Sequence, residues 1–172
     1  MLPVNISLKA FVFIAALGVA FQAQAGERAL AFPVRGVVAE VMVSSGKSVA
    51  RGAPLVRLDM TTFKAHLNSA QAGLKAAESV LAFALRNRDD VKQLYDDLST
   101  SGEDLEKAEI RLANAEASLG KAREYAEIAA WNFEKATLRA PAPGIVKSVR
   151  GYAGLVVDPR SGLVPVIILS TK

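Results

Sequence analysis

The sequence predicts an α+β fold in which a long antiparallel coiled-coil hairpin divides a small β domain into two halves. Three observations support this fold class. A segment rich in valine and glycine occurs twice, the chain between the copies has a seven-residue apolar repeat, and that repeat is interrupted once by turn-forming residues. We therefore expect residues 32–59 and 138–170 to form the β domain and residues 60–137 to form the hairpin.

The duplicated segment reads RGVVAEVMVSSGKSV at residues 35–49 and PGIVKSVRGYAGLVV at residues 143–157. A shift of 108 places Gly36 on Gly144, and one further glycine and three valines also match. Short valine and isoleucine runs alternate with glycine and proline, which is typical of strands joined by turns. Because each copy is too small to bury a core alone, we expect the two copies to form one domain.

The chain between the copies contains two series of apolar residues in steps of three and four. The first series runs from Phe63 to Leu98 with Arg88 as its only polar member, and the second runs from Leu105 to Ala136. This spacing predicts one apolar seam on each of two long helices.

The residues STSGED at 99–104 predict the end of the first helix and the start of the second. If the hairpin turns at residues 100–102, most large residues of one seam face small residues of the other, and the pair next to the turn is Leu98 with Leu105. Alternation of large and small residues is how two helices interdigitate at close range. Each arm would reach about 50 Å.

Residues 1–25 have the pattern of a cleaved export signal. Lys9 precedes an apolar run from Ala10 to Phe21, and a small-x-small tripeptide ends at Ala25. The run is shorter than the roughly 20 residues that a membrane-spanning helix needs. The absence of cysteine excludes a lipid-anchored form. We therefore expect an exported protein that is cleaved near Ala25, and the alternative is that the apolar run is retained as an anchor.

Composition argues against several classes of function. The net charge is only +4 and shows no basic stripe with aromatic residues, so nucleic-acid binding is not expected. A single histidine, no cysteine and no close carboxylate pair in a β-turn context leave no catalytic constellation, so we expect no enzyme. The SSGKS stretch lacks the first glycine of a phosphate loop, because that position is Val41. His66, Met42 and Met60 form no ligand-spaced pair, so we expect no metal site.

The two half-motifs resemble those of biotinyl/lipoyl domains, and more specifically those of periplasmic adaptor (membrane fusion, HlyD-like) proteins of bacterial export systems. The residues that carry this resemblance are Leu58, Asp59, Phe63, Ala65 and Leu67 after the first half and Leu138, Ala140, Pro141 and Gly144 at the start of the second. The resemblance covers residues 32–170. It implies a split biotinyl/lipoyl-like β-sandwich with an inserted hairpin. Typical members also carry a β-barrel domain and a membrane-proximal domain, and this sequence departs from them there. We therefore expect either a minimal form with only these two modules or a gene truncated relative to its relatives.

The resemblance implies a non-enzymatic adaptor subunit of a tripartite efflux or secretion system, without a cofactor. Such a subunit forms homo-oligomeric rings and links an inner-membrane transporter, directly or through another adaptor, to an outer-membrane channel protein. An alternative is an envelope scaffold that uses the same fold without a channel partner. A carrier domain would need a modified lysine at the junction of the halves, and Lys64 lies inside the helical pattern.

In the family, the hairpin tip carries an arginine, a leucine four residues later and a serine seven residues after that. Leu94 and Ser101 keep the second spacing, whereas position 90 is Asp90 and the nearest arginine is Arg88. The expected tip contacts are Arg88, Leu94, Ser101 and Leu105. Arg88 has a second interpretation, in which it pairs with Glu116 or another nearby carboxylate.

A second candidate surface lies on the second helix. Tyr125, Ile128 and Trp131 follow each other at intervals of three, away from the seam. A two-helix hairpin has few surfaces on which these residues can pack. We therefore weigh a contact with a neighbouring subunit against ordinary packing, and the sequence leaves both open.

Overall fold

The computed structural model describes residues 26–162 and 164–171. The predicted export signal, residues 1–25, lies outside the described residues, so its cleavage stays a prediction. In chain order the elements are β1 (Gly26–Leu30), β2 (Gly36–Val41), β3 (Ser48–Val49), β4 (Pro54–Leu58), α1 (Thr61–Asp96), α2 (Gly102–Lys135), β5 (Thr137–Arg139), β6 (Gly144–Val149), β7 (Val156–Val157), the short 3-10 helix η1 (Pro159–Ser161) and β8 (Ile167–Thr171).

The strands form two four-stranded antiparallel sheets around one apolar core. Their orders are β1-β8-β6-β3 and β5-β4-β2-β7. The largest fully buried side chains come from both sheets and include Leu55, Leu58, Ile167 and Leu169. Burying each such side chain contributes about 1.5–3 kcal/mol, so this shared core holds the two sheets together.

The two halves of the β domain are interleaved. Strands β2 and β6, and likewise β3 and β7, are related by the shift of 108 that the sequence shows. Strand β3 pairs with β6, and β7 pairs with β2, so each half contributes a strand to the sheet of the other. The amide of Gly46 donates to the carbonyl of Val146 at 2.7 Å, and that of Gly154 donates to Val38 at 2.8 Å. The two halves of the β domain are therefore related by an internal pseudo-twofold axis.

Strand β1 was not predicted from the sequence. It pairs with β8 along the edge of its sheet, as β5 pairs with β4 in the other. The shift of 108 places Leu30 on Leu138 and Pro33 on Pro141, so the repeat begins earlier than the glycines suggest. That match was the available signal for β1.

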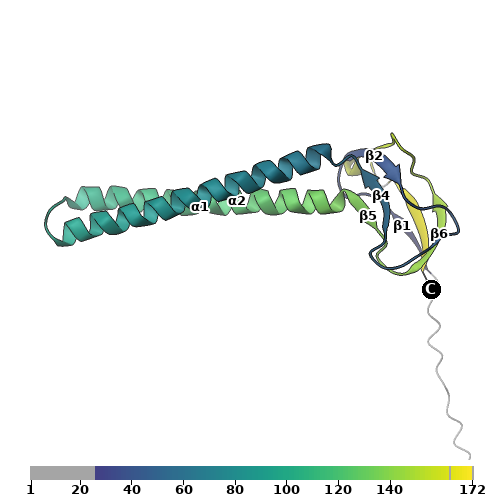
Figure 1. The fold of residues 1–172 in the computed structure, drawn as a ribbon, viewed down its shortest axis with the longest axis horizontal. Coiled ribbons are helices and arrows are strands. Elements are labelled where there is room, and N and C mark those ends of the chain that lie inside the picture. The colour runs from purple at the N-terminus through teal and green to yellow at the C-terminus, as the bar shows by residue number, and fades with distance from the viewer. Residues whose placement is uncertain (1–25, 163, 172) are drawn as a thin grey trace, which may run out of the picture.

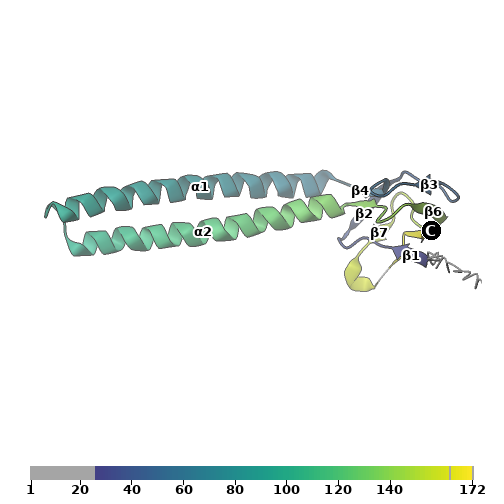
Figure 2. The ribbon, with the colours of Figure 1, turned by 90° about the horizontal axis from the view of Figure 1, so that it is seen from below.

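The hairpin leaves the β domain from two neighbouring strands. Arg57 of β4 is paired with Thr137 of β5, and the amide of Leu58 donates to the carbonyl of Ala136 at 2.9 Å. Helix α1 follows β4 after two residues, and α2 ends just before β5. The start of α1 and the end of α2 therefore lie side by side, and the two helices project together away from the sheets (Figures 1 and 2). Within the described residues, no helix combines the length and apolarity needed to cross a membrane.

The predicted seams are confirmed along most of the hairpin. Every predicted seam residue from Phe63 to Val91 in α1, and from Leu105 to Ala136 in α2, is buried or half-buried. Ala84 packs in the middle of α1, and Ala108 and Ala115 are nearly inaccessible in α2. Burial of these two seams against each other therefore holds the helices together.

The last predicted pair of the seam is wrong. Leu98 does not face Leu105, because α1 ends at Asp96 and the turn occupies residues 97–101 instead of 100–102. Leu98 has a φ of +56° and is 93% exposed. The chain reverses earlier than predicted because it closes α1 with a left-handed residue rather than one more helical turn.

We expect Gly144→Ala to destabilise the β domain. A Cβ atom at Gly144 would lie 2.3 Å from the carbonyl oxygen of Ser170, in the neighbouring strand β8. Relief of this overlap requires the paired strands to move, at a cost of about 1–3 kcal/mol. Gly120→Ala is the control, because that helical site is open and alanine there should stabilise by about 1 kcal/mol. Urea unfolding followed by circular dichroism measures both, and equal stabilities would contradict the prediction.

Candidate functional site

The hairpin tip exposes three large apolar side chains. Leu94 and Tyr95 in the last turn of α1 are 48% and 42% exposed, and Leu98 in the turn is 93% exposed. The tip lies at the far end of the molecule from the β domain (Figure 1). Exposed apolar side chains at a projecting end are available to a partner protein.

Leu98 occupies the position where helices usually end with glycine. Its amide donates to the carbonyl of Tyr95 at 3.0 Å, and the amide of Ser99 donates to Leu94 at 2.7 Å. These two hydrogen bonds are those of a Schellman motif, whose left-handed residue is Leu98. A left-handed conformation costs a residue with a side chain about 1–2 kcal/mol. The tip therefore keeps a leucine at a place where glycine would be less strained.

The start of α2 is closed by a reciprocal cap. Ser101 Oγ accepts a hydrogen bond from the amide of Asp104 at 3.2 Å and donates one to Asp104 Oδ2 at 2.7 Å. Thr100 Oγ1 donates to the same carboxylate oxygen at 3.0 Å. The hydroxyl groups of Ser101 and then Thr100 lower the pKa of the Asp104 carboxyl below its ordinary value. The cap fixes the backbone of the turn that presents Leu98.

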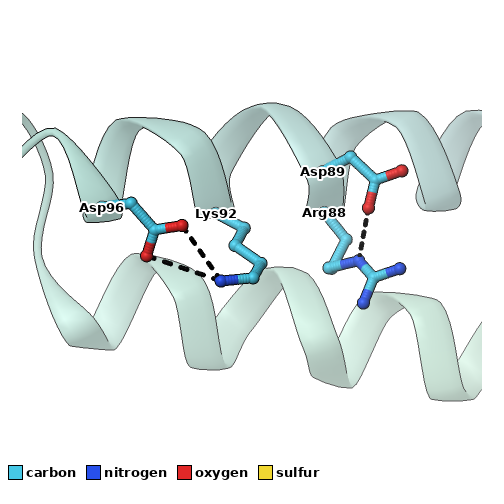
Figure 3. Close-up of polar contacts among 4 residues, drawn as sticks. All are labelled: Arg88, Asp89, Lys92 and Asp96. Carbon is cyan, nitrogen blue, oxygen red and sulfur yellow. Dashed lines mark hydrogen bonds and ion pairs between the residues drawn. The ribbon is translucent and has the colours of Figure 1, made fainter.

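The tip is strongly acidic. Residues 89–106 contain seven carboxylates and one lysine, a net charge of −6. Lys92 Nζ lies 3.0 Å from Asp96 Oδ2 one turn later, and the pair lies along the helix surface (Figure 3). Arg88 and Lys107, which flank this range, pair with Asp89 and Glu103 and offset two of these charges, so the tip remains negative. In the described part of the chain, no group of three or more histidine, aspartate and glutamate side chains is placed to hold a metal ion.

Arg88 extends from α1 toward α2, two turns below the end of the helix (Figure 3). Its Nε lies 2.9 Å from Asp89 Oδ1, so its ion-pair partner is this neighbour rather than Glu116. The Nε atom is buried and makes no hydrogen bond, because the contact with Asp89 is poorly aligned. The side chain is 32% exposed. Arg88 is therefore a partly buried member of the seam that still reaches solvent.

The four predicted tip residues do not form one patch. Leu94 and Ser101 are exposed at the tip, whereas Leu105 is half-buried in the seam. Sequence reasoning placed Leu98 in the seam and so missed the most exposed apolar side chain of the tip. The available signal was the segment Asp96–Thr100, whose aspartate, serine and threonine residues favour the end of a helix. Because this segment contains no glycine, one of its other residues must adopt the left-handed conformation.

The second predicted surface is split by the helix geometry. Tyr125 and Ile128 line a groove of about 670 Å³ between the helices near their base, together with His66, Gly73 and Arg35. Trp131 is 47% exposed but does not line this groove. Each step of three residues turns about 300° around the helix, which is about 60° short of a full turn. After two steps, from Tyr125 to Trp131, the side chain therefore lies on another side of α2.

Solved structures share the fold of this chain. The membrane fusion protein Spr0693 from Streptococcus pneumoniae R6 matches 85% of this chain with a TM-score of 0.66 and 17% identity. A candidate efflux transporter from Bacteroides eggerthii matches 85% with a TM-score of 0.64 and 23% identity. A MacA–MexA chimera with the α-hairpin of Pseudomonas aeruginosa MexA matches 84% with a TM-score of 0.62 and 22% identity.

The chain has the fold of the membrane fusion and periplasmic adaptor proteins. The resemblance expected from the half-motifs and the inserted hairpin is therefore confirmed for the fold. This chain spans 59%, 40% and 46% of the lengths of the three matched proteins, in the order given above. No protein-family model matches the chain, and no curated protein matches its sequence.

We expect Ser101→Ala to loosen the tip. The substitution removes the N-cap of α2, at a cost of about 1 kcal/mol, and one of the two hydroxyl donors to Asp104. The pKa of Asp104 should therefore rise toward its ordinary value. NMR titration of the carboxyl groups measures this shift, with Asp59, whose pKa the amide of Thr61 lowers, as the internal reference. An unchanged Asp104 titration would contradict the cap.

The pH dependence follows from the direction of the shift. Because the pKa of Asp104 is lower in the folded tip, its contacts contribute fully at neutral pH. That contribution is lost as the pH falls below the ordinary pKa of an aspartate and through the lowered one.

Proposed function

We propose that the protein is a periplasmic adaptor subunit of a tripartite efflux or secretion system. Its hairpin tip binds an outer-membrane channel protein, and its β domain faces an inner-membrane transporter, directly or through another adaptor. The fold shared with membrane fusion and adaptor proteins supports this proposal. In the same proposal, the chain has two separate modules. The β domain, residues 32–59 with 138–170, serves assembly, and the hairpin, residues 60–137, extends to the channel protein. Copies of the chain assemble into a homo-oligomer.

The single observation that carries the proposal is the strained and exposed Leu98. Strain in a backbone persists where the surrounding structure enforces it, and such positions cluster at functional sites. Here the Schellman hydrogen bonds and the Ser101 cap enforce the turn, and the strained residue offers its whole side chain to solvent. An apolar anchor on a rigid support loses little entropy when it enters a pocket.

The tip has the size and position of a docking element. Helices of 36 and 34 residues place Leu98 about 50 Å from the β domain. Leu94 is one turn before Leu98 and adds a second exposed apolar side chain. Ser101 contributes by fixing the turn, while Arg88 and Leu105 lie partly buried in the seam behind the tip. The acidic surroundings favour a channel surface that carries basic side chains.

Site-specific crosslinking tests the proposal. The chain has no cysteine, so Ser99→Cys places a single thiol at the tip, and Ser45→Cys places one on the β domain as the matched control. Both sites are exposed. In intact cells we expect the tip thiol, but not the control thiol, to capture an outer-membrane channel protein identified by mass spectrometry. Capture of no channel protein from the tip would favour the scaffold alternative.

Leu98→Gly separates stability from binding. Glycine relieves the left-handed strain, so the free protein should become about 1 kcal/mol more stable in urea unfolding. The same change removes the anchor, so capture of the channel protein from Ser99→Cys should fall about tenfold or more. Leu98→Ala is the companion variant, because it removes the anchor without the gain in stability. Undiminished capture by both variants would show that Leu98 does not make the contact.

A further inference from the structure

One long face of the hairpin is apolar and hollowed along its length. Near the base, the groove of about 670 Å³ is lined by Gly73 of α1 and Tyr125 of α2. Farther toward the tip, a second hollow of about 320 Å³ is lined by Val80 and Phe83 of α1 and by Ser118, Asn114 and Arg111 of α2, with Arg111 as its one charged residue. Gly73 and Val80, like Ser118 and Tyr125, are seven residues apart. Because seven residues are nearly two full turns, both hollows lie on the same side, which we call the apolar face.

The opposite side of the hairpin is more polar, although Leu85, seven residues after Glu78, is 37% exposed there. Two residues before each of these lining positions, about 200° around the helix, lie Gln71 and Glu78 in α1 and Glu116 and Arg123 in α2. The hairpin is therefore amphipathic beyond its seam. Its apolar face leaves Val80 55%, Phe83 65% and Tyr125 66% exposed in a single copy.

The apolar face continues toward the tip. Leu94 lies two seven-residue steps beyond Val80, and Ile110 lies four residues before Asn114, which lines the second hollow. Leu94 and Ile110 are 48% and 53% exposed. Two helices cannot enclose such a face, whereas two hairpins placed face to face form a four-helix bundle that buries it. A second copy of this chain supplies a surface of the same length, spacing and apolarity.

The charge distribution decides the relative direction of the two copies. The tip, residues 89–106, carries a net charge of −6, whereas residues 26–60 and 137–171 contain nine basic and four acidic residues, a net charge of +5. Parallel copies would place two acidic tips together. Antiparallel copies place each acidic tip beside the basic base of the other hairpin, which is favourable within the screening distance of about 8 Å.

The base of the apolar face shows this basic character directly. The groove there meets a further hollow of about 450 Å³, and Arg35 lines both. Arg160 also lines that hollow. Asp158 lies 3.6 Å from Arg35 and offsets part of its charge, while the Arg35 side chain remains 75% exposed. An acidic tip that reached the base would meet these two guanidinium groups.

We propose that two copies of this chain pair through their apolar faces in opposite directions. The pair is isologous: Phe83 and Val80 lie near its centre, and the tip of each copy lies beside Arg35 and Arg160 of the other. This pairing does not depend on the channel partner. It covers the apolar face while the protein is free, and the two copies separate when hairpins dock side by side in the same direction.

Sedimentation of the purified protein tests the pairing. We expect a monomer–dimer equilibrium that Phe83→Ser weakens about tenfold or more, because it removes an apolar side chain from the centre of the interface. Trp131→Ser is the matched control, since it removes an exposed aromatic residue outside the apolar face. Circular dichroism confirms that both variants stay helical. A protein that is monomeric at every concentration, or a dimer that both variants affect equally, would overturn the proposal.

Salt and crosslinking test the direction. An antiparallel dimer should weaken as sodium chloride increases from about 50 to 500 mM, whereas a parallel dimer should strengthen because salt screens the acidic tips. A short bis-maleimide should join Ser99→Cys at the tip of one copy to Thr62→Cys at the base of another. Efficient joining of two Ser99→Cys chains would show a parallel pair and overturn the antiparallel arrangement.

Discussion

The pairing of β4 with β5 is the constraint on which the rest of the structure depends. It joins the strand that enters the hairpin to the strand that leaves it, through the Arg57–Thr137 register and the hydrogen bond from Leu58 to Ala136. Both helices therefore start from fixed, adjacent points. A shift of this register would displace one helix along the other over the whole hairpin. The pairing within the β domain therefore determines the position of the tip.

The hairpin and the β domain solve the problem of burial in different ways. The β domain interleaves two halves and buries its core completely, whereas the hairpin buries only one narrow seam per helix. That seam relies on alanines such as Ala84 and Ala115, which bring the helices close but contribute little apolar area each. The remaining apolar side chains stay on the surface. A projecting two-helix arm thus has binding surfaces as a direct consequence of its architecture.

Most of the fold could be predicted from the sequence, because two strong periodic signals determine it. The shift of 108 revealed the duplicated β segment, and the heptad series located the seam residue by residue from Phe63 to Val91. Strand β1 was missed because it contains no β-branched residue and lies before the first glycine of the repeat.

The candidate site was harder to predict, because it depends on where a helix stops. The heptad pattern runs through Leu98 without interruption, so periodicity assigned that residue to the seam. The position of the turn is decided by a left-handed residue and a serine cap, which are local events that periodicity does not report. The surface at Tyr125 and Ile128 was anticipated in part. Its extension through Phe83 required knowledge of how the two helices face each other.

The interleaving of the two halves has a consequence for how the chain acquires its structure. Strands β2 and β7 pair across more than a hundred residues, as do β3 and β6 across nearly as many, so neither sheet can be completed by the first half alone. Closing a loop of that length in a disordered chain costs entropy that grows with its logarithm. Pairing of α1 with α2 shortens this loop, because it holds the start of α1 and the end of α2 side by side next to the Leu58–Ala136 hydrogen bond. The arm that reaches outward in the finished molecule is thus also the element that delivers its two β halves to each other.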